Sequence, residues 1–141
     1  MEHQMIRILG TQRSPDGEEN EIELVTEGKR YEKSGATYIV YDETTLSGME
    51  GSTTTLKIEG TERVSMKRFG SAASLLVFER GKRHRGDYHT PYGQFRMEIK
   101  TNELKIDIAP TQRTGSIKIA YDMYIVGLAE TSNVLTITLL M

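Results

Sequence analysis

The sequence feature that most constrains the fold is an alternation of apolar and polar residues with a period of two. It is clearest in residues 116–125, where Ile117, Ile119 and Tyr121 share one face of an extended chain. Strands with one buried and one wet face are typical of antiparallel sheets, because parallel strands are usually apolar on both faces. The same alternation recurs in residues 21–24, 55–59, 104–108 and 135–139.

Short turns separate these strand-like segments, and glycine marks many of them. No segment shows a helical period over the length needed to connect two parallel strands. Residues 69–78 fit both a helical stripe and a buried strand, and we favour the strand because Gly70 and Gly81 bound it too closely for a helix. Because sequential hairpins pair neighbours in sequence, we predict an all-β fold: a single antiparallel up-and-down β-barrel of roughly eight to ten strands.

The composition fits such a barrel. The 141 residues suit one domain, residues 1–141, and the hydrophobic content of 37% is slightly low, which suggests a partly polar interior. No apolar run is long enough to cross a membrane, and the first residues lack the basic start of a signal peptide, so we expect a cytoplasmic protein. The absence of cysteine and the net charge of −2 exclude a disulfide framework, a thiolate metal site and a chain that is basic throughout.

Residues with catalytic or metal-binding chemistry do not form a recognisable pattern. His84, Asp87 and His89 are close in sequence, but the two histidines are an odd number of positions apart and would face opposite sides of a strand. There is no Gly-x-Ser-x-Gly elbow, and residues 48–53 lack the ending of a phosphate loop and fit a hairpin connection better. We therefore expect a protein that is not an enzyme and has no metal site and no cofactor.

A scattered set of amphipathic residues suggests a ligand site inside the barrel. Tyr121 lies on the most apolar face of the chain, so its hydroxyl requires either a protein partner or a ligand. Arg68, if it points inward, requires an acid or a bound anion, and Glu43 is the candidate acid. With Tyr38 and Tyr88, these residues are our candidates for binding a small, partly polar or anionic molecule. The alternatives are an internal hydrogen-bonded network that only stabilises the barrel, or side chains that simply point outward to solvent.

A basic hairpin is the second candidate site. It contains Arg80, Lys82, Arg83 and Arg85, and it could dock on RNA or on an acidic protein with an affinity that falls steeply with salt. The simpler interpretation is a solvated hairpin tip, because long charged side chains are common there and acidic neighbours dilute the charge. We favour the interior site, so nucleic acid and membranes are not expected partners, and the protein would be a monomer or a homodimer.

Several motifs resemble those of a known family. The most specific are Gly-Met-Glu-Gly-x-Thr-Thr-Thr at residues 48–55 and Tyr-x-Thr-Pro-Tyr-Gly at residues 88–93. These stretches, together with residues 38–43, 68–70 and 121–123, resemble the YwiB-like proteins of Firmicute-type bacteria, over about residues 4–140. The resemblance implies a cytoplasmic, lipocalin-like (calycin-like) antiparallel β-barrel in a family without an established activity, and it supplies no catalytic residues.

Overall fold

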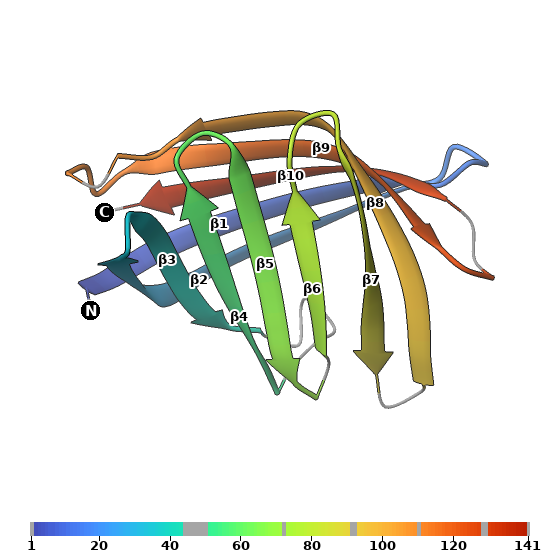
Figure 1. Cartoon of the computed structure of the whole chain (residues 1–141), viewed down its shortest axis with the longest axis horizontal. Helices are drawn as coiled ribbons and strands as arrows, with labels where there is room; N and C mark the ends of the chain where they lie inside the picture. The colour runs from blue at the N-terminus through green and yellow to red at the C-terminus, as the bar shows by residue number, and fades with distance from the viewer. Residues whose placement is uncertain are drawn as a thin grey trace.

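The described part of the chain is built from β-strands joined by short connections. The computed structural model describes residues 2–43, 51–71, 73–90, 93–109, 111–127 and 130–140, so residues 48–50 of the expected connection lie outside it. Figure 1 shows the arrangement of the strands. Their bounds are β1 Glu2–Arg13, β2 Glu19–Lys33, β3 Ala36–Asp42, β4 Ser52–Glu59, β5 Arg63–Gly70, β6 Ala73–Phe78, β7 Arg83–Thr90, β8 Gly93–Asp107, β9 Gly115–Ile125 and β10 Thr131–Leu140.

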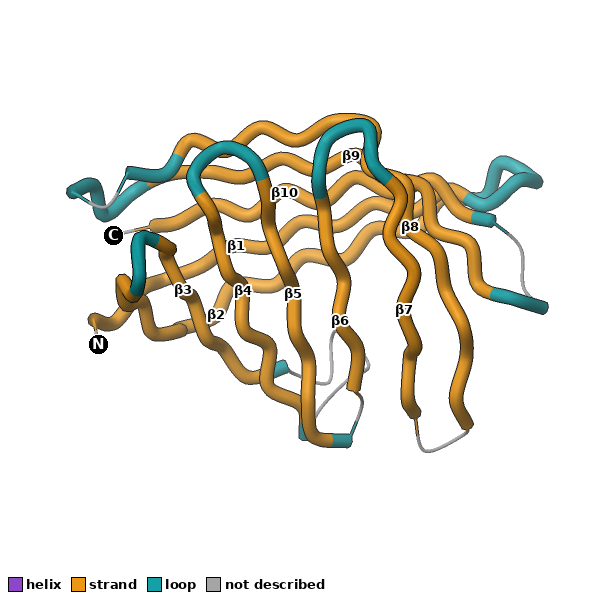
Figure 2. The backbone as a smooth tube through the Cα atoms, in the orientation of Figure 1, coloured by secondary structure: helices purple, strands orange, loops and turns teal. Residues whose placement is uncertain are grey.

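These ten strands of the described residues close into one antiparallel barrel, in which each strand pairs with its neighbours in sequence. β1 also pairs with β10, from Met5 opposite Leu140 to Arg13 opposite Ser132, and this ladder closes the barrel. Figure 2 shows strands and loops, without a helix, in the described residues. Of residues 69–78, for which we favoured a strand over a helix, residues 69–70 end β5 and residues 73–78 form β6. The prediction of an all-β up-and-down barrel is therefore confirmed. That part of the chain contains no helix long and apolar enough to cross a membrane.

The barrel consists of two sets of strands that cross at a steep angle. In Figure 1, β1, β2, β9 and β10 run lengthwise behind the shorter strands β3 to β7, and the long strand β8 curves from one set into the other. Among the described residues, pairing is sparsest between β6 and β7, which pair at residues 73–74 and 88–89. The ladders of β5 with β6 and of β7 with β8 are longer, so the barrel wall is least tightly joined between β6 and β7.

The alternation read from the sequence decides which side chains fill the barrel. Ile117 and Ile119 of β9 are fully buried, while Lys118 between them is exposed, as the pattern predicts. Other strands contribute equally buried aliphatic or aromatic side chains to the same core, namely Ile6, Ile39, Leu56, Val64, Phe78, Leu104, Ile137 and Leu139. Burial of each such side chain stabilises the fold by roughly 1.5–3 kcal/mol, so this half of the barrel is a conventional apolar core.

Towards the other end of the barrel the inward positions change from aliphatic to polar. The change occurs on four consecutive strands: from Ile39 to Tyr41 on β3, Leu56 to Thr54 on β4, Met66 to Arg68 on β5 and Leu76 to Ser74 on β6. All eight side chains are buried. One side of the interior at this end is therefore polar, which is consistent with the slightly low hydrophobic content of the chain.

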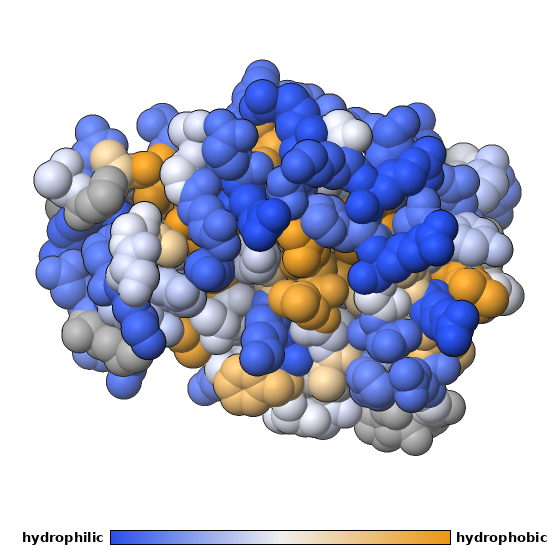
Figure 3. Space-filling view, in the orientation of Figure 1, coloured by the Kyte–Doolittle hydropathy of each residue, from blue (hydrophilic) through white to orange (hydrophobic). Residues whose placement is uncertain are grey.

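The outer face of the barrel is mainly hydrophilic. Figure 3 shows hydrophobic side chains gathered near the middle of one face, within a largely hydrophilic surface. The outward residues Phe69 of β5 and Leu75 of β6 are each about half exposed, at 50% and 51%. Single exposed hydrophobic residues are normal on soluble proteins, so these two alone do not define a binding surface.

Candidate ligand site in the barrel

The end of the barrel that contains these polar side chains holds a cavity of about 380 Å³. This volume lies within the range of about 300–1,000 Å³ that is usual for small-molecule sites. Ile22 of β2 lines the cavity and is 48% exposed, so the cavity opens to solvent beside that strand. Its walls are mostly apolar, and the side chains that form them include Ile8, Leu24, Met66, Leu76, Met97, Met123, Ile125 and Leu135.

Five polar side chains form an arc around one side of the cavity because the strand register aligns them. Tyr41 on β3 is opposite Thr54 on β4, and Thr54 is opposite Arg68 on β5. Arg68 is in turn opposite Ser74 on β6, and Ser74 is opposite Tyr88 on β7. Directly opposed residues of an antiparallel pair point to the same side of the sheet, with Cβ atoms about 4.5–5.5 Å apart. Residues distant in sequence thus become neighbours in one row.

Arg68 and Glu43 form a buried ion pair within this arc. The Arg68 Nη2 donates to Glu43 Oε1 at 3.2 Å, and the two side chains are only 9% and 3% exposed. Thr54 Oγ1 donates to the same carboxylate oxygen at 2.6 Å. The prediction that an inward Arg68 is partnered by Glu43 is therefore confirmed. Such a pair contributes little net stability, but removal of one partner leaves a buried charge at a cost of about 3–5 kcal/mol.

Two buried donors of the arc have no hydrogen-bond partner among the described residues. They are the Arg68 Nε and the Ser74 Oγ, whose residues are 8% and 7% exposed and both line the cavity. Buried polar groups in folded proteins are satisfied in the large majority of cases, and an unsatisfied one costs about 1–3 kcal/mol. The arc therefore presents two adjacent donors that an acceptor in the cavity could satisfy.

Three tyrosines, Tyr41, Tyr88 and Tyr121, line the cavity. Burial raises the pKa of Tyr121 to about 12, although the positive charge of Arg68 acts to lower it, and the Tyr121 ring packs on Phe78 with centroids 4.9 Å apart. Burial and, secondarily, the negative charge of Glu43 raise the pKa of Tyr41 well above its usual value. Because Tyr41 and Tyr121 stay protonated at neutral pH, their hydroxyls can donate as well as accept hydrogen bonds.

The structure separates one candidate residue from the others. Tyr38 lies on the outer face of β3, where its ring stacks on Tyr31 at 4.9 Å and Lys57 Nζ lies 5.8 Å from its centroid. Its predicted place at the ligand site is therefore wrong. The reason is the parity of the strand: Thr37 and Ile39 are buried, so Tyr38 between them must point outward. Tyr41, three positions on, takes the inward place instead.

Comparison with known proteins identifies the family. The model of the family "Domain of unknown function (DUF1934)" matches residues 6–137, nearly the whole chain. The chain belongs to this family. No curated protein matches the sequence.

One solved structure with the fold of this DUF1934 chain is described as the ywiB protein from Bacillus subtilis. It superposes with a TM-score of 0.83, covers 97% of this chain and 89% of its own, and is 24% identical in sequence. At this level of identity the likeness shows the fold alone. It confirms the resemblance to YwiB-like proteins and the closed antiparallel barrel.

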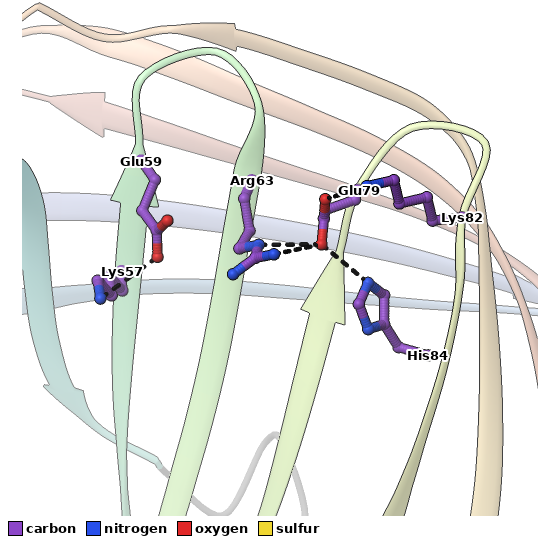
Figure 4. Close-up of polar contacts among 6 residues, drawn as sticks. All are labelled: Lys57, Glu59, Arg63, Glu79, Lys82 and His84. Carbon is purple, nitrogen blue, oxygen red and sulfur yellow. Dashed lines mark hydrogen bonds and ion pairs between the residues drawn. The ribbon is translucent and has the colours of Figure 1, made fainter.

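The basic hairpin of this DUF1934 chain is extensively paired. Figure 4 shows Glu79 between Arg63, Lys82 and His84, with distances of 2.7, 3.1 and 3.1 Å. The hydrogen bond from Lys82 is the largest of the effects that hold the pKa of Glu79 below its usual value.

The remaining cations of the hairpin also have acceptors. Arg83 and Arg85 both reach Glu98, at 2.9 and 3.4 Å, and Arg80 donates to the carbonyl of Leu104. Glutamates thus neutralise much of the positive charge that the sequence concentrates in the hairpin. In the part of the chain that the structure describes, no three potential metal ligands lie together, and His84 instead contacts Glu79.

Proposed function

We propose that this protein binds a small amphipathic molecule in its barrel, in the cytoplasm, and that it binds rather than transforms that molecule. The observation that supports this most directly is a pair of buried donors, on Arg68 and Ser74, that have no partner among the described residues and lie at the wall of a mostly apolar cavity. Ligand sites in proteins are mostly apolar with a few placed polar groups, and the polar arc fits that description. The apolar wall would hold the body of the ligand and the arc its polar end.

The alternative function, docking on RNA or on an acidic protein through Arg80, Lys82, Arg83 and Arg85, has weaker support. A docking surface needs cations that can release counterions to a partner, and the glutamates beside this hairpin already pair with three of these side chains. The cavity gives the interior site an independent argument that the hairpin lacks. We therefore retain ligand binding as the proposed function.

The fluorescent probe anilinonaphthalene sulfonate tests for an accessible apolar cavity. We expect saturable fluorescence enhancement with the folded protein, because the probe becomes fluorescent when it leaves water for an apolar site. Leu76→Trp would fill the cavity, since Leu76 points inward, and should abolish the enhancement. Leu75→Trp adds the same ring to the exposed outer face of the same strand and serves as the matched control.

The outcomes of this experiment are separable. Circular dichroism establishes that both variants are folded, and the tryptophan spectrum reports its own surroundings, since the natural chain has no tryptophan. Enhancement with the natural protein and with Leu75→Trp, but not with Leu76→Trp, supports the proposal. Equal enhancement with both variants, or none with the natural protein, would refute a ligand site in the barrel.

A further inference from the structure

The barrel contains two clusters with the same residue types around a buried arginine, and among the described residues only one of them leaves buried donors without a partner. At the other end of the barrel, Arg30 is 6% exposed, and each of its three guanidinium nitrogens has an acceptor. Nη1 donates to the carbonyl of Gln112 at 2.7 Å, Nη2 donates to the carbonyl of Ala109 at 2.9 Å, and Nε donates to the carboxylate of Glu32 at 3.3 Å. Thr37 donates to the same glutamate at 2.6 Å. This cluster is a closed structural network.

The cluster of Arg68, Glu43 and Thr54 repeats these residue types at the cavity, but with spare capacity. Its arginine gives Nη2 to Glu43 and leaves Nε without a partner in the described residues. The Ser74 hydroxyl, on the directly paired position of the next strand, is unpartnered as well. Buried polar groups are satisfied in the large majority of cases, and Arg68 Nε and Ser74 Oγ both lie at the cavity, so the difference between the clusters points to an external acceptor there.

The chemistry of these two donors selects the acceptor. A guanidinium N–H and a neighbouring hydroxyl, on directly opposed residues, match the two oxygens of one carboxylate, and such charge-assisted hydrogen bonds are about twice as strong as neutral ones. Arg68 and Glu43 both line the cavity, so the guanidinium of the ion pair borders the space that a ligand would occupy.

The size and the lining of the cavity limit the rest of the ligand. Among the described residues that line it, the charged side chains are Arg68 and Glu43, and most others are aliphatic or aromatic. A volume of about 380 Å³ holds about a dozen groups the size of a water molecule or a methylene, at about 30 Å³ each. A single charged head and an apolar chain of moderate length would satisfy both conditions.

We infer that the ligand is a medium-chain monocarboxylate, whose carboxylate accepts hydrogen bonds from the Arg68 Nε and the Ser74 Oγ. This inference rests on the proposed function and specifies its ligand class. The apolar chain lies along Leu24 and Met123 and ends near Ile22, where the cavity opens. The negative charge of Glu43 then opposes binding, because it repels the ligand carboxylate.

Calorimetric titration with three probes of equal chain length tests the head group. The probes are decanoate, decanol and decyltrimethylammonium, and we expect decanoate to bind at least about tenfold more tightly than the other two, since hydrogen bonds to charged groups are worth that much or more. Similar affinities for all three would overturn the carboxylate inference and leave the proposed function intact. If none binds while the naphthalene probe still enters the cavity, the carboxylate inference is overturned in the same way; if that probe fails too, the proposed function is refuted.

Two substitutions of the arc have opposite expected effects on decanoate affinity. Ser74→Ala removes one donor and should weaken binding about tenfold, whereas Ser65→Ala on the outer face of β5 is the matched control and should leave it unchanged. Glu43→Gln removes the competing charge and should strengthen binding about tenfold or more. Unchanged affinity in Ser74→Ala, or weaker binding in folded Glu43→Gln, would overturn the inference. If Glu43→Gln does not fold, Ser74→Ala and the probe series still decide it.

Discussion

Replacement of Arg68 by methionine should destabilise the protein severely, because Glu43 would remain buried without its cation. The Glu43 side chain is 3% exposed, so solvent cannot replace the guanidinium that lies 3.2 Å from its carboxylate. Removal of one partner of a buried ion pair costs about 3–5 kcal/mol, a large share of the roughly 5–15 kcal/mol that stabilises a typical domain. An unfolding entropy of about 2.1 cal/mol/K per residue over 141 residues converts this loss to a decrease in Tm of about 10–17 °C.

A double-mutant cycle separates the lost charge pair from the lost packing of the arginine stem. Glu43→Gln with Arg68→Met leaves no buried charge, and the glutamine can still accept the hydrogen bond from Thr54. We expect the double variant to lose only about 1–2 kcal/mol, well below the sum of the single losses. Urea unfolding followed by far-ultraviolet circular dichroism gives all four free energies. A loss below about 1 kcal/mol in Arg68→Met, or additive losses in the cycle, would refute the burial argument.

Three further predictions concern other parts of the molecule. The pKa of Tyr121 is raised to about 12 from an ordinary 10.0, so between these pH values the folded state keeps a proton that the unfolded state loses. The free energy of unfolding in urea should therefore fall between about pH 10 and 12, and this fall should be smaller in Tyr121→Phe. Gly70→Ala should lower the free energy of unfolding by about 1–3 kcal/mol more than Gly81→Ala does in the same assay. A Cβ at Gly70 would lie against a backbone oxygen of Gly51, whereas at Gly81 nothing lies within 4 Å, so equal losses would contradict this. Fluorescence anisotropy should show no binding of single-stranded RNA at physiological salt, since glutamates pair with the basic hairpin at residues 80–85; salt-sensitive binding that serine substitutions in the hairpin abolish would contradict this.

The sequence predicts the fold well because a two-residue period determines which face of a strand each side chain occupies. Once Ile117 and Ile119 are assigned to the buried face, the face of each remaining residue of that strand is fixed by alternation. Short turns then favour pairing between strands that are neighbours in sequence. The same rule could have placed Tyr38 correctly, since the apolar Ile39 beside it marks the inner face. Tyr38 was predicted at the site because it is a tyrosine, although its position in the alternation places it on the outer face.

The site is less predictable than the fold because it depends on register. The inward position on β4 is Thr54, on the face of Leu56 and Ile58, and parity alone identifies it. The row that joins it to Arg68 and Ser74 requires the pairings of β4 with β5 and of β5 with β6, which turn geometry sets and composition does not. Glu43 was predictable as the partner of Arg68 only because a buried arginine needs an acid.

The two arginine clusters show why residue types alone could not separate a satisfied network from one that leaves a buried donor without a partner among the described residues. Both contain one arginine, one glutamate and one threonine, and both arginines are buried, although Glu32 is 41% exposed whereas Glu43 is 3% exposed. Arg30 lies beside the connection between β8 and β9, whose backbone carbonyls accept two of its hydrogen bonds. Arg68 faces a cavity with mostly apolar walls, where the described residues supply no acceptor for its Nε. The position of each arginine relative to a chain connection, rather than its residue type, therefore determines which cluster finds its acceptors within the described residues.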